Sequence, residues 1–310
     1  MLSGAASAPF SAPALWLTGL ARGLMLIGLA VALGGLAGRG LARQYLTRHP
    51  QERPGPLPEP WALRGCVLGL AASAALLVTA VLGPGIAARL AQPPVTGLRS
   101  SATGVIAAAE LACFALAAIL LRLRQTGWSM LPLAGVVVAE GIRSHPDGII
   151  PVAGALLTYC HLLPALLWAG MLAYVLRAAV AWRSEPAAVT GLIRLYGNAA
   201  AWLFSVVMVT GIVQALLLVP LGSVLTTAYG LFLVAKAAVV AVVAGLAIAG
   251  RVWLRRHPRP GAGPALATRL EVVALAVVLI ITGILTVITP PARPIFSSAA
   301  AVREHAGPAS

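Results

Sequence analysis

The stretch 198–219, NAAAWLFSVVMVTGIVQALLLV, decides the fold class because it is apolar throughout and contains no Asp, Glu, Lys or Arg. An α-helix needs about 20 consecutive apolar residues to cross the hydrocarbon core of a bilayer. The apolar residues are continuous rather than alternating, which excludes the strands of a membrane β-barrel. This stretch therefore predicts one membrane-spanning helix.

The same pattern recurs along the chain. Of its 310 residues 60% are hydrophobic and only 10% are charged, and the mean hydropathy is +0.94. These values exclude a soluble enzyme, a disordered protein and a disulfide scaffold. Eight stretches qualify or nearly qualify as spans: 14–37, 61–82, 103–121, 127–142, 149–181, 198–219, 229–249 and 270–288. We expect an all-α, polytopic membrane helical bundle of about eight transmembrane helices over residues 1–292, with a mobile extracytoplasmic tail over 293–310.

The distribution of the arginines predicts the orientation. The net charge is +14, from 22 Lys and Arg against 8 Asp and Glu, and cytoplasmic loops of membrane proteins are enriched in such cations. One side of the predicted topology carries 15 arginines: Arg39, Arg43, Arg48, Arg53, Arg64, Arg122, Arg124, Arg177, Arg183, Arg194, Arg251, Arg255, Arg256, Arg259 and Arg269. The other side carries 5: Arg89, Arg99, Arg143, Arg293 and Arg303. We therefore expect both termini to be extracytoplasmic, and the basic charge reflects topology and gives no support to nucleic-acid binding.

Five ionisable residues fall within the spans: Arg22, Glu110, His161, Lys236 and Glu271. Such groups are costly in a bilayer, by a few kcal/mol on insertion scales, so each is a candidate functional residue. At a rise of about 1.5 Å per residue, the first four lie in the outer half of the membrane or near its midplane. We expect an intramembrane charge cluster that opens outward. A purely structural ion pair of Glu110 with Lys236 or Arg22 is the alternative, and Glu271 near its helix start is expected to be structural.

His161 is the most informative of these residues. A neutral imidazole within a span binds a metal or haem iron, or relays protons. Trp168 lies seven residues further on, on the same helix face. Thiolate, thioether and imidazole groups suit Cu(I), so Cys160, Met171 and Met208 are candidate further ligands.

A second candidate metal site lies in the predicted outer loop after the fourth span. His145 and Asp147 lie in this loop, and Glu140 lies at the end of the span. Together they could collect a metal ion from the periplasmic side. An ordinary solvated loop is the alternative interpretation.

Several stretches resemble the bacterial copper resistance protein D (CopD) family. The helix HLLPALLWAGMLAYVL (161–176) has the family's His followed by a Trp-small-Gly step. The stretches AWLFSVVMVTGIVQALL (201–217) and GSVLTTAYGLFLVAKAAVV (222–240) resemble its T-G-x-V-x-A and T-x-Y-G-x-x-L-x-x-K segments. The last span, RLEVVALAVVLIITGILTVITPPA (269–292), resembles the family's closing helix, with a Glu near its start and a Pro-Pro exit. The order and spacing of these motifs carry the resemblance, which covers roughly Tyr159 to Ala292.

The resemblance implies an eight-helix inner-membrane protein linked to copper uptake or tolerance, often acting with a separate periplasmic copper-binding protein. The positions that match the family are His161, Trp168, Tyr229, Gly230, Lys236 and Glu271. His145 matches loosely, because the family tends to have Gly-His where this chain has Ser-His.

Three functional hypotheses follow. The first is a non-enzymatic copper-handling protein embedded in the lipid bilayer, with copper passing from the outer side to a midplane site at His161. The second is a haem-binding redox protein, in which His161 ligates haem b, Lys236 contacts a propionate or the iron, and Trp168 lines the site. The third is a non-catalytic assembly subunit whose buried charges only hold helices together.

Overall fold

The computed structural model describes residues 13–52, 54–82, 102–144, 150, 152–256, 266–288 and 290–291. Within these ranges the chain is helical and has no strands, as the apolar stretches predict. The elements are α1 (Pro13–Arg48), α2 (Ala62–Leu82), α5 (Ala102–Arg122), α6 (Met130–Ile142), α8 (Ala153–Ala181), α9 (Pro186–Leu218), the 3-10 turn η1 (Leu221–Ser223), α10 (Ala228–Arg256) and α11 (Leu266–Leu285).

Six of the described helices are long and apolar enough to cross a bilayer, namely α1, α2, α5, α8, α9 and α10. The helices coincide with the eight predicted stretches, but several are longer. Helix α1 continues to Arg48, beyond the predicted end of the first span at residue 37. Helix α9 begins at Pro186, well before the predicted start at 198, and proline suits the first position of a helix. Hydropathy detects only the part of a helix that lies in lipid, so its polar extensions are missed.

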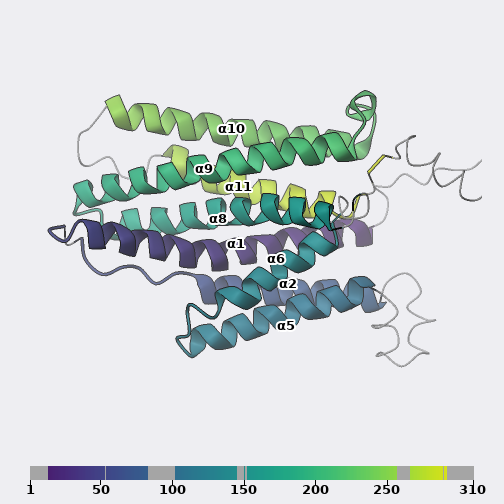
Figure 1. The fold of residues 1–310 in the computed structure, drawn as a ribbon, viewed down its shortest axis with the longest axis horizontal. Helices are drawn as coiled ribbons and strands as arrows, with labels where there is room; N and C mark the ends of the chain where they lie inside the picture. Colours follow the sequence, from purple (N-terminus) through teal and green to yellow (C-terminus); the bar gives the residue numbers. More distant parts are fainter. Residues whose placement is uncertain are drawn as a thin grey trace, which may run out of the picture.

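Helix α1 is the central element of the bundle (Figure 1). It packs against α2, α8 and α11. On one flank α2 packs on α5, which leads to α6, and on the other flank α9 packs on α8 and α10 packs on α11. In its apolar window α1 is 72% buried inside the bundle, whereas α9 is only 11% buried. The outer helices thus present apolar surface to lipid, including Trp202, Val209 and Ile212 of α9.

Glycines on α1 allow its neighbours to approach closely. A Cβ atom at Gly34 would collide with the backbone of Gly170 on α8, and one at Gly170 would collide with the carbonyl of Ala30. Gly283 of α11 lies in the same way against Gly23. Small residues at such crossings let membrane helices gain packing energy without a hydrophobic driving force.

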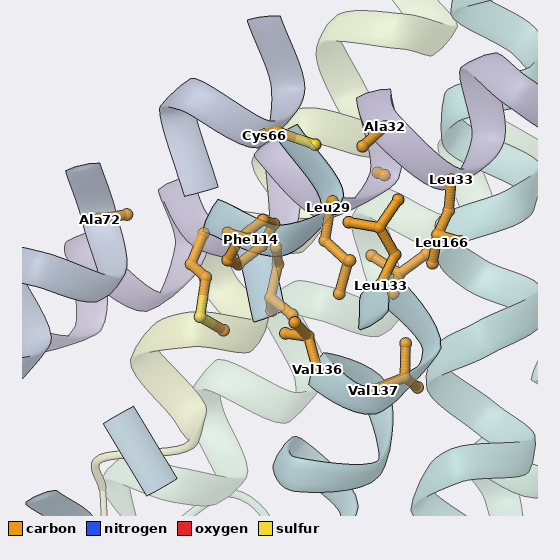
Figure 2. Packing of buried hydrophobic residues seen from close by; sticks show 14 of the residues in the cluster. Leu29, Ala32, Leu33, Cys66, Ala72, Phe114, Leu133, Val136, Val137 and Leu166 are labelled. Carbon is orange, nitrogen blue, oxygen red and sulfur yellow. The ribbon is translucent and has the colours of Figure 1, made fainter. Parts of the chain in front are cut away.

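The main hydrophobic core fills the space between α1, α2, α5, α6 and α8 (Figure 2). Phe114 of α5, Leu29 of α1 and Leu166 of α8 are completely buried there, together with Leu133 and Val136 of α6. This core holds α6, which at 13 residues is about 20 Å long and too short to span the hydrocarbon core unaided.

Candidate functional site

The side chain of His161 lies between α8 and α9. Its Nδ1 atom is 3.1 Å from the carbonyl oxygen of Val207 and 3.0 Å from the hydroxyl oxygen of Thr210, both on α9. Among the described residues, none forms a hydrogen bond with the other ring nitrogen, Nε2.

These contacts determine which ring nitrogen carries the proton. The Val207 carbonyl can only accept a hydrogen bond, so Nδ1 must be the donor. The Thr210 hydroxyl donates to the carbonyl of Val206 at 2.6 Å, so its oxygen accepts from Nδ1. Neutral His161 therefore presents the lone pair of Nε2. A histidine that donates from one nitrogen to a backbone carbonyl and offers the other is arranged like the metal-ligating histidines of proteins.

Two further residues adjoin the His161 ring. Gly211 lies beside it, since a Cβ atom at that position would be only 3.0 Å from Cε1 of the ring. Lys236 of α10 lies within electrostatic range of the ring. The site thus combines a free imidazole nitrogen from α8 with a cationic group from α10. Helix α8 packs on α1 and α9, whereas α10 packs on α11.

A line of polar groups leads from His161 toward the end of the bundle where α8 begins. The amide of Gln214 lies 3.5 Å from the Thr158 hydroxyl, which in turn donates to Ser144 Oγ at 3.0 Å. We call Ser144, Thr158, Gln214, Thr210 and His161 the polar track. Thr158 and His161 are three residues apart on α8, and Thr210 and Gln214 four apart on α9, so each pair lies on one helix face. This spacing of uncharged polar residues is readable from the sequence.

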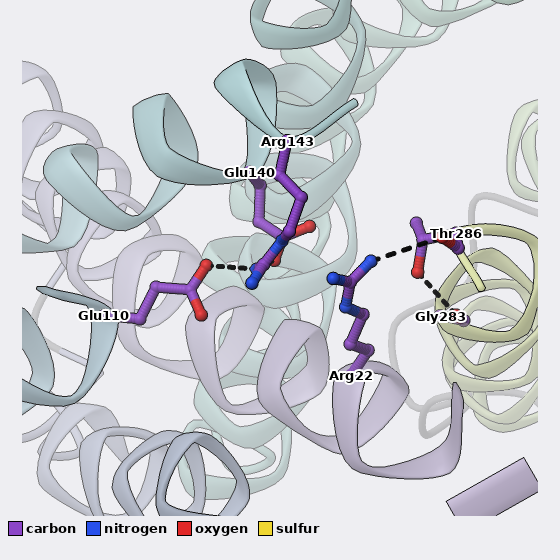
Figure 3. A network of polar contacts seen from close by, with 6 residues as sticks. All are labelled: Arg22, Glu110, Glu140, Arg143, Gly283 and Thr286. Carbon is purple, nitrogen blue, oxygen red and sulfur yellow. Dashed lines mark hydrogen bonds and ion pairs between the residues drawn. The ribbon is translucent and has the colours of Figure 1, made fainter. Parts of the chain in front are cut away.

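A separate charge cluster lies between α1, α5 and α6 and consists of Arg22, Glu110, Glu140 and Arg143 (Figure 3). The guanidinium of Arg143 pairs with both carboxylates. Arg22 donates to the carbonyl of Thr286, just after the end of α11, at 3.4 Å and lies within electrostatic range of both glutamates. With all four groups ionised the cluster is neutral. Breaking one such buried pair costs about 3–5 kcal/mol because it leaves a charge unpaired.

The charge cluster differs from the expectation in its membership. Glu110 pairs with Arg143, not with Lys236 or Arg22. The sequence places Arg143 in an outer loop, but its side chain is only 10% exposed and reaches back from the end of α6. Glu140 is buried and bound to Arg143, so it does not face outward with the loop that holds His145. The ionisable residues predicted as one set therefore divide: Arg22 and Glu110 belong to the charge cluster, and Lys236 lies within electrostatic range of His161.

The remaining candidate ligands lie in different surroundings. Met171 and Trp168 are buried in the hydrophobic cluster around Tyr174, and Trp168 meets the Phe204 ring edge-on at 5.4 Å. Met171 is ten residues beyond His161, about 15 Å along α8. Met208 and Cys160 are exposed.

Within the described ranges, no group of three or more His, Cys, Asp and Glu residues is arranged to hold a metal ion. His145, Asp147 and the side chain of Glu271 lie outside the described residues.

The comparisons with known proteins add a family. The model of the family described as CopD, copper resistance protein D, matches residues 190–289, which run from the first turns of α9 past the end of α11. Lys236, Tyr229, Gly230 and Glu271 lie inside the matched region, and His161 lies outside it. No curated protein and no solved structure matches the chain. The match covers less than half of the chain, so residues 190–289 are similar to this family, and the long apolar helices are those of a polytopic membrane protein.

Proposed function

We propose that this protein handles copper at the bacterial inner membrane and that Nε2 of His161 is the protein atom that receives the ion. The family match suggests copper resistance in general terms. The single observation that supports this particular site is the fixed His161 ring, whose Nδ1 is held by α9 while Nε2 stays free.

The proposed route enters from the end of the bundle where α8 begins. Ser144, Thr158 and Gln214 supply oxygen and amide groups that lead from this end to His161. Cu(I) needs soft ligands in addition to imidazole. Met208 follows Val207, whose carbonyl holds the ring, and Cys160 precedes His161, so these two are the proposed transient partners.

The proposal also assigns roles to two loop residues, to a separate protein and to Lys236. His145 and Asp147 would form the first contact for the ion there. A separate periplasmic copper-binding protein would deliver it. Lys236 would repel a second cation and so limit the site to one ion.

Copper accumulation in whole cells tests the proposal. Cells lacking the endogenous protein are supplied with the wild type, His161→Ala, or His49→Ala, and their copper content is measured at equal protein levels in the membrane fraction. His49 lies just after α1, stacked on Tyr45, and serves as a matched histidine control. We expect His161→Ala to abolish the copper phenotype and His49→Ala to retain it. Equal copper content in all three strains contradicts the proposal.

A haem-binding redox protein is the second candidate. The observation that favours it is that Lys236 of α10 lies within electrostatic range of the His161 imidazole on α8. A histidine nitrogen is a common axial ligand of haem iron, and a lysine ammonium suits a propionate. The visible spectrum of the purified protein separates the two candidates. A Soret band that disappears in His161→Ala indicates haem b, and bound copper without a Soret band indicates the first candidate.

The third candidate, a non-catalytic assembly subunit, has its own pattern of outcomes. It predicts no bound copper, no haem and an unchanged copper phenotype in His161→Ala cells. The copper content of whole cells, the visible spectrum and the copper content of the purified protein together distinguish all three candidates.

A further inference from the structure

Four arginines gather at the end of the bundle away from the polar track, and no part of the proposed copper function uses them. Arg39 and Arg43 lie in the last turns of α1, Arg64 lies in the first turn of α2, and Arg177 lies near the end of α8. We refer to these four residues as the arginine cluster.

The cluster surrounds Tyr174 of α8. The Tyr174 hydroxyl donates to the carbonyl of Pro58 at 2.9 Å, which fixes the ring against the segment between α1 and α2. Arg39, Arg43 and Arg177 all lie within electrostatic range of this hydroxyl. Arg177 also donates to the carbonyl of Glu59 at 2.6 Å, so its guanidinium is held in place.

Trp61 joins the fourth arginine to the group. The guanidinium carbon of Arg177 lies 4.2 Å from the centre of the Trp61 ring and that of Arg64 lies 5.4 Å from it. Two cations on one indole repel each other, and Arg64 and Arg177 are within electrostatic range. Trp61 is 43% exposed, so a ligand outside the bundle can reach the arginine cluster at this residue.

Among the described residues, the arginine cluster has no carboxylate partner. The ion pairs among the described residues are those of Arg143 with Glu110 and Glu140, which belong to the charge cluster and not to the arginine cluster. The Glu52 carboxylate, in the segment between α1 and α2, accepts a hydrogen bond from the Tyr45 hydroxyl at 2.5 Å. In addition, Nε of Arg39 is buried and has no hydrogen-bond partner. The site therefore holds concentrated positive charge and at least one unused donor.

We propose that the arginine cluster binds the phosphate group of an anionic phospholipid. Guanidinium groups match phosphate oxygens in charge and in paired hydrogen-bond geometry. Tryptophan prefers the level of the lipid headgroups, and basic groups at helix ends there recognise anionic lipids. Val67, one turn after Arg64 on α2, is 55% exposed and offers apolar surface for an acyl chain. This neighbouring apolar surface favours a lipid over a free phosphate ion.

Lipid binding to the detergent-purified full-length chain tests the proposal. Fluorescent short-chain phosphatidylglycerol is titrated against the wild type, Arg177→Gln, Arg43→Gln and Arg194→Gln, with phosphatidylcholine as the zwitterionic comparison. Arg194 is an exposed arginine of α9 that lies outside the cluster and is the matched control. We expect each cluster variant to lose about fivefold in affinity for phosphatidylglycerol, since one arginine contributes about that factor at a membrane surface. Arg194→Gln should bind like the wild type.

Three results would overturn the proposal: equal affinity for phosphatidylcholine, equal losses in the cluster variants and Arg194→Gln, or no loss in any variant. Arg43 is exposed at the end of α1, so Arg43→Gln keeps the test valid if Arg177→Gln fails to fold.

Inorganic phosphate serves as a competitor. If it displaces the lipid at equal concentration, the site is one for free phosphate and the lipid assignment is wrong. If it does not, the acyl chains contribute and the lipid assignment stands.

Discussion

At the scale of single residues, Thr210 controls how His161 presents its free nitrogen. The threonine hydroxyl donates its proton to the carbonyl of Val206 and accepts from Nδ1 of the ring, so the ring is held by two acceptors on α9. Outer partners of this kind tune metal affinity by about 10- to 100-fold when they are removed. Thr210 therefore acts as a positioning residue for the proposed ligand.

Replacing the hydroxyl separates this positioning role from simple packing. We expect Thr210→Val, which keeps the shape of the side chain, to weaken Cu(I) binding by about tenfold, and Thr210→Ser to keep wild-type affinity. Competition of the purified protein with a coloured Cu(I) chelator measures both. Equal affinities of the valine and serine variants would show that the hydroxyl is not involved.

The sequence predicted some of the residues of the site and missed their partners, for a physical reason. Arg22, Glu110, His161 and Lys236 stand out because an ionisable group is costly in a bilayer. Thr158, Thr210 and Gln214 do not stand out, because uncharged polar side chains are common in membrane helices. The partner of Glu110 was mispredicted because Arg143 follows the end of α6, and its long side chain reaches back into the bundle.

At the scale of the elements, close helix crossings determine which helices pack on α1. Hydropathy predicts the approximate position of each of the eight described α-helices, but it does not reveal which helices cross closely, because the crossings depend on glycines that face each other from distant parts of the chain. Gly34 of α1 and Gly170 of α8 form one such crossing. The four-residue spacing of glycines in the sequence predicts that some helix can approach closely, but it does not identify which helix does so.

A pair of identical substitutions tests the crossing of α1 and α8. We expect Gly170→Ala to destabilise the protein by about 1–3 kcal/mol, since the new methyl group would meet the backbone at Ala30, which cannot move aside. Gly40→Ala on α1 is the control, because nothing lies within 4 Å of a Cβ there and alanine favours the helix by about 0.5–1 kcal/mol. Thermal unfolding in detergent, followed by tryptophan fluorescence, should give a lower Tm for Gly170→Ala alone. Equal Tm values in both variants would contradict the crossing.

At the scale of the whole molecule, the charge cluster and the polar track show which helix ends lie together. Arg22 near the start of α1 donates to Thr286 just after the end of α11, so the first and last described helices meet at one end of the bundle. Arg143 after α6 pairs with Glu110 in the first half of α5, and Ser144 accepts from Thr158 near the start of α8. Helix α6 therefore returns the chain to the end from which α5 starts, although it is short.

The orientation of this bundle in the membrane is the last prediction. Because the Arg143 side chain is buried in the charge cluster, it no longer counts as a loop charge, which leaves four arginines on the outer side against 15 on the other. The bias toward the end that carries the arginine cluster thus becomes stronger, and it predicts that this end is cytoplasmic.

Labelling of single cysteines in intact cells measures the orientation. In a background that carries Cys160→Ser, because Cys160 is exposed, Leu221→Cys in η1 should react with a membrane-impermeant maleimide. Leu221 is 81% exposed and lies at the predicted outer end. Gln51→Cys, in the exposed segment after α1, should react only after the membrane is permeabilised. The reverse pattern would place the arginine cluster on the outer side of the membrane. The polar track would then lead to His161 from the cytoplasm.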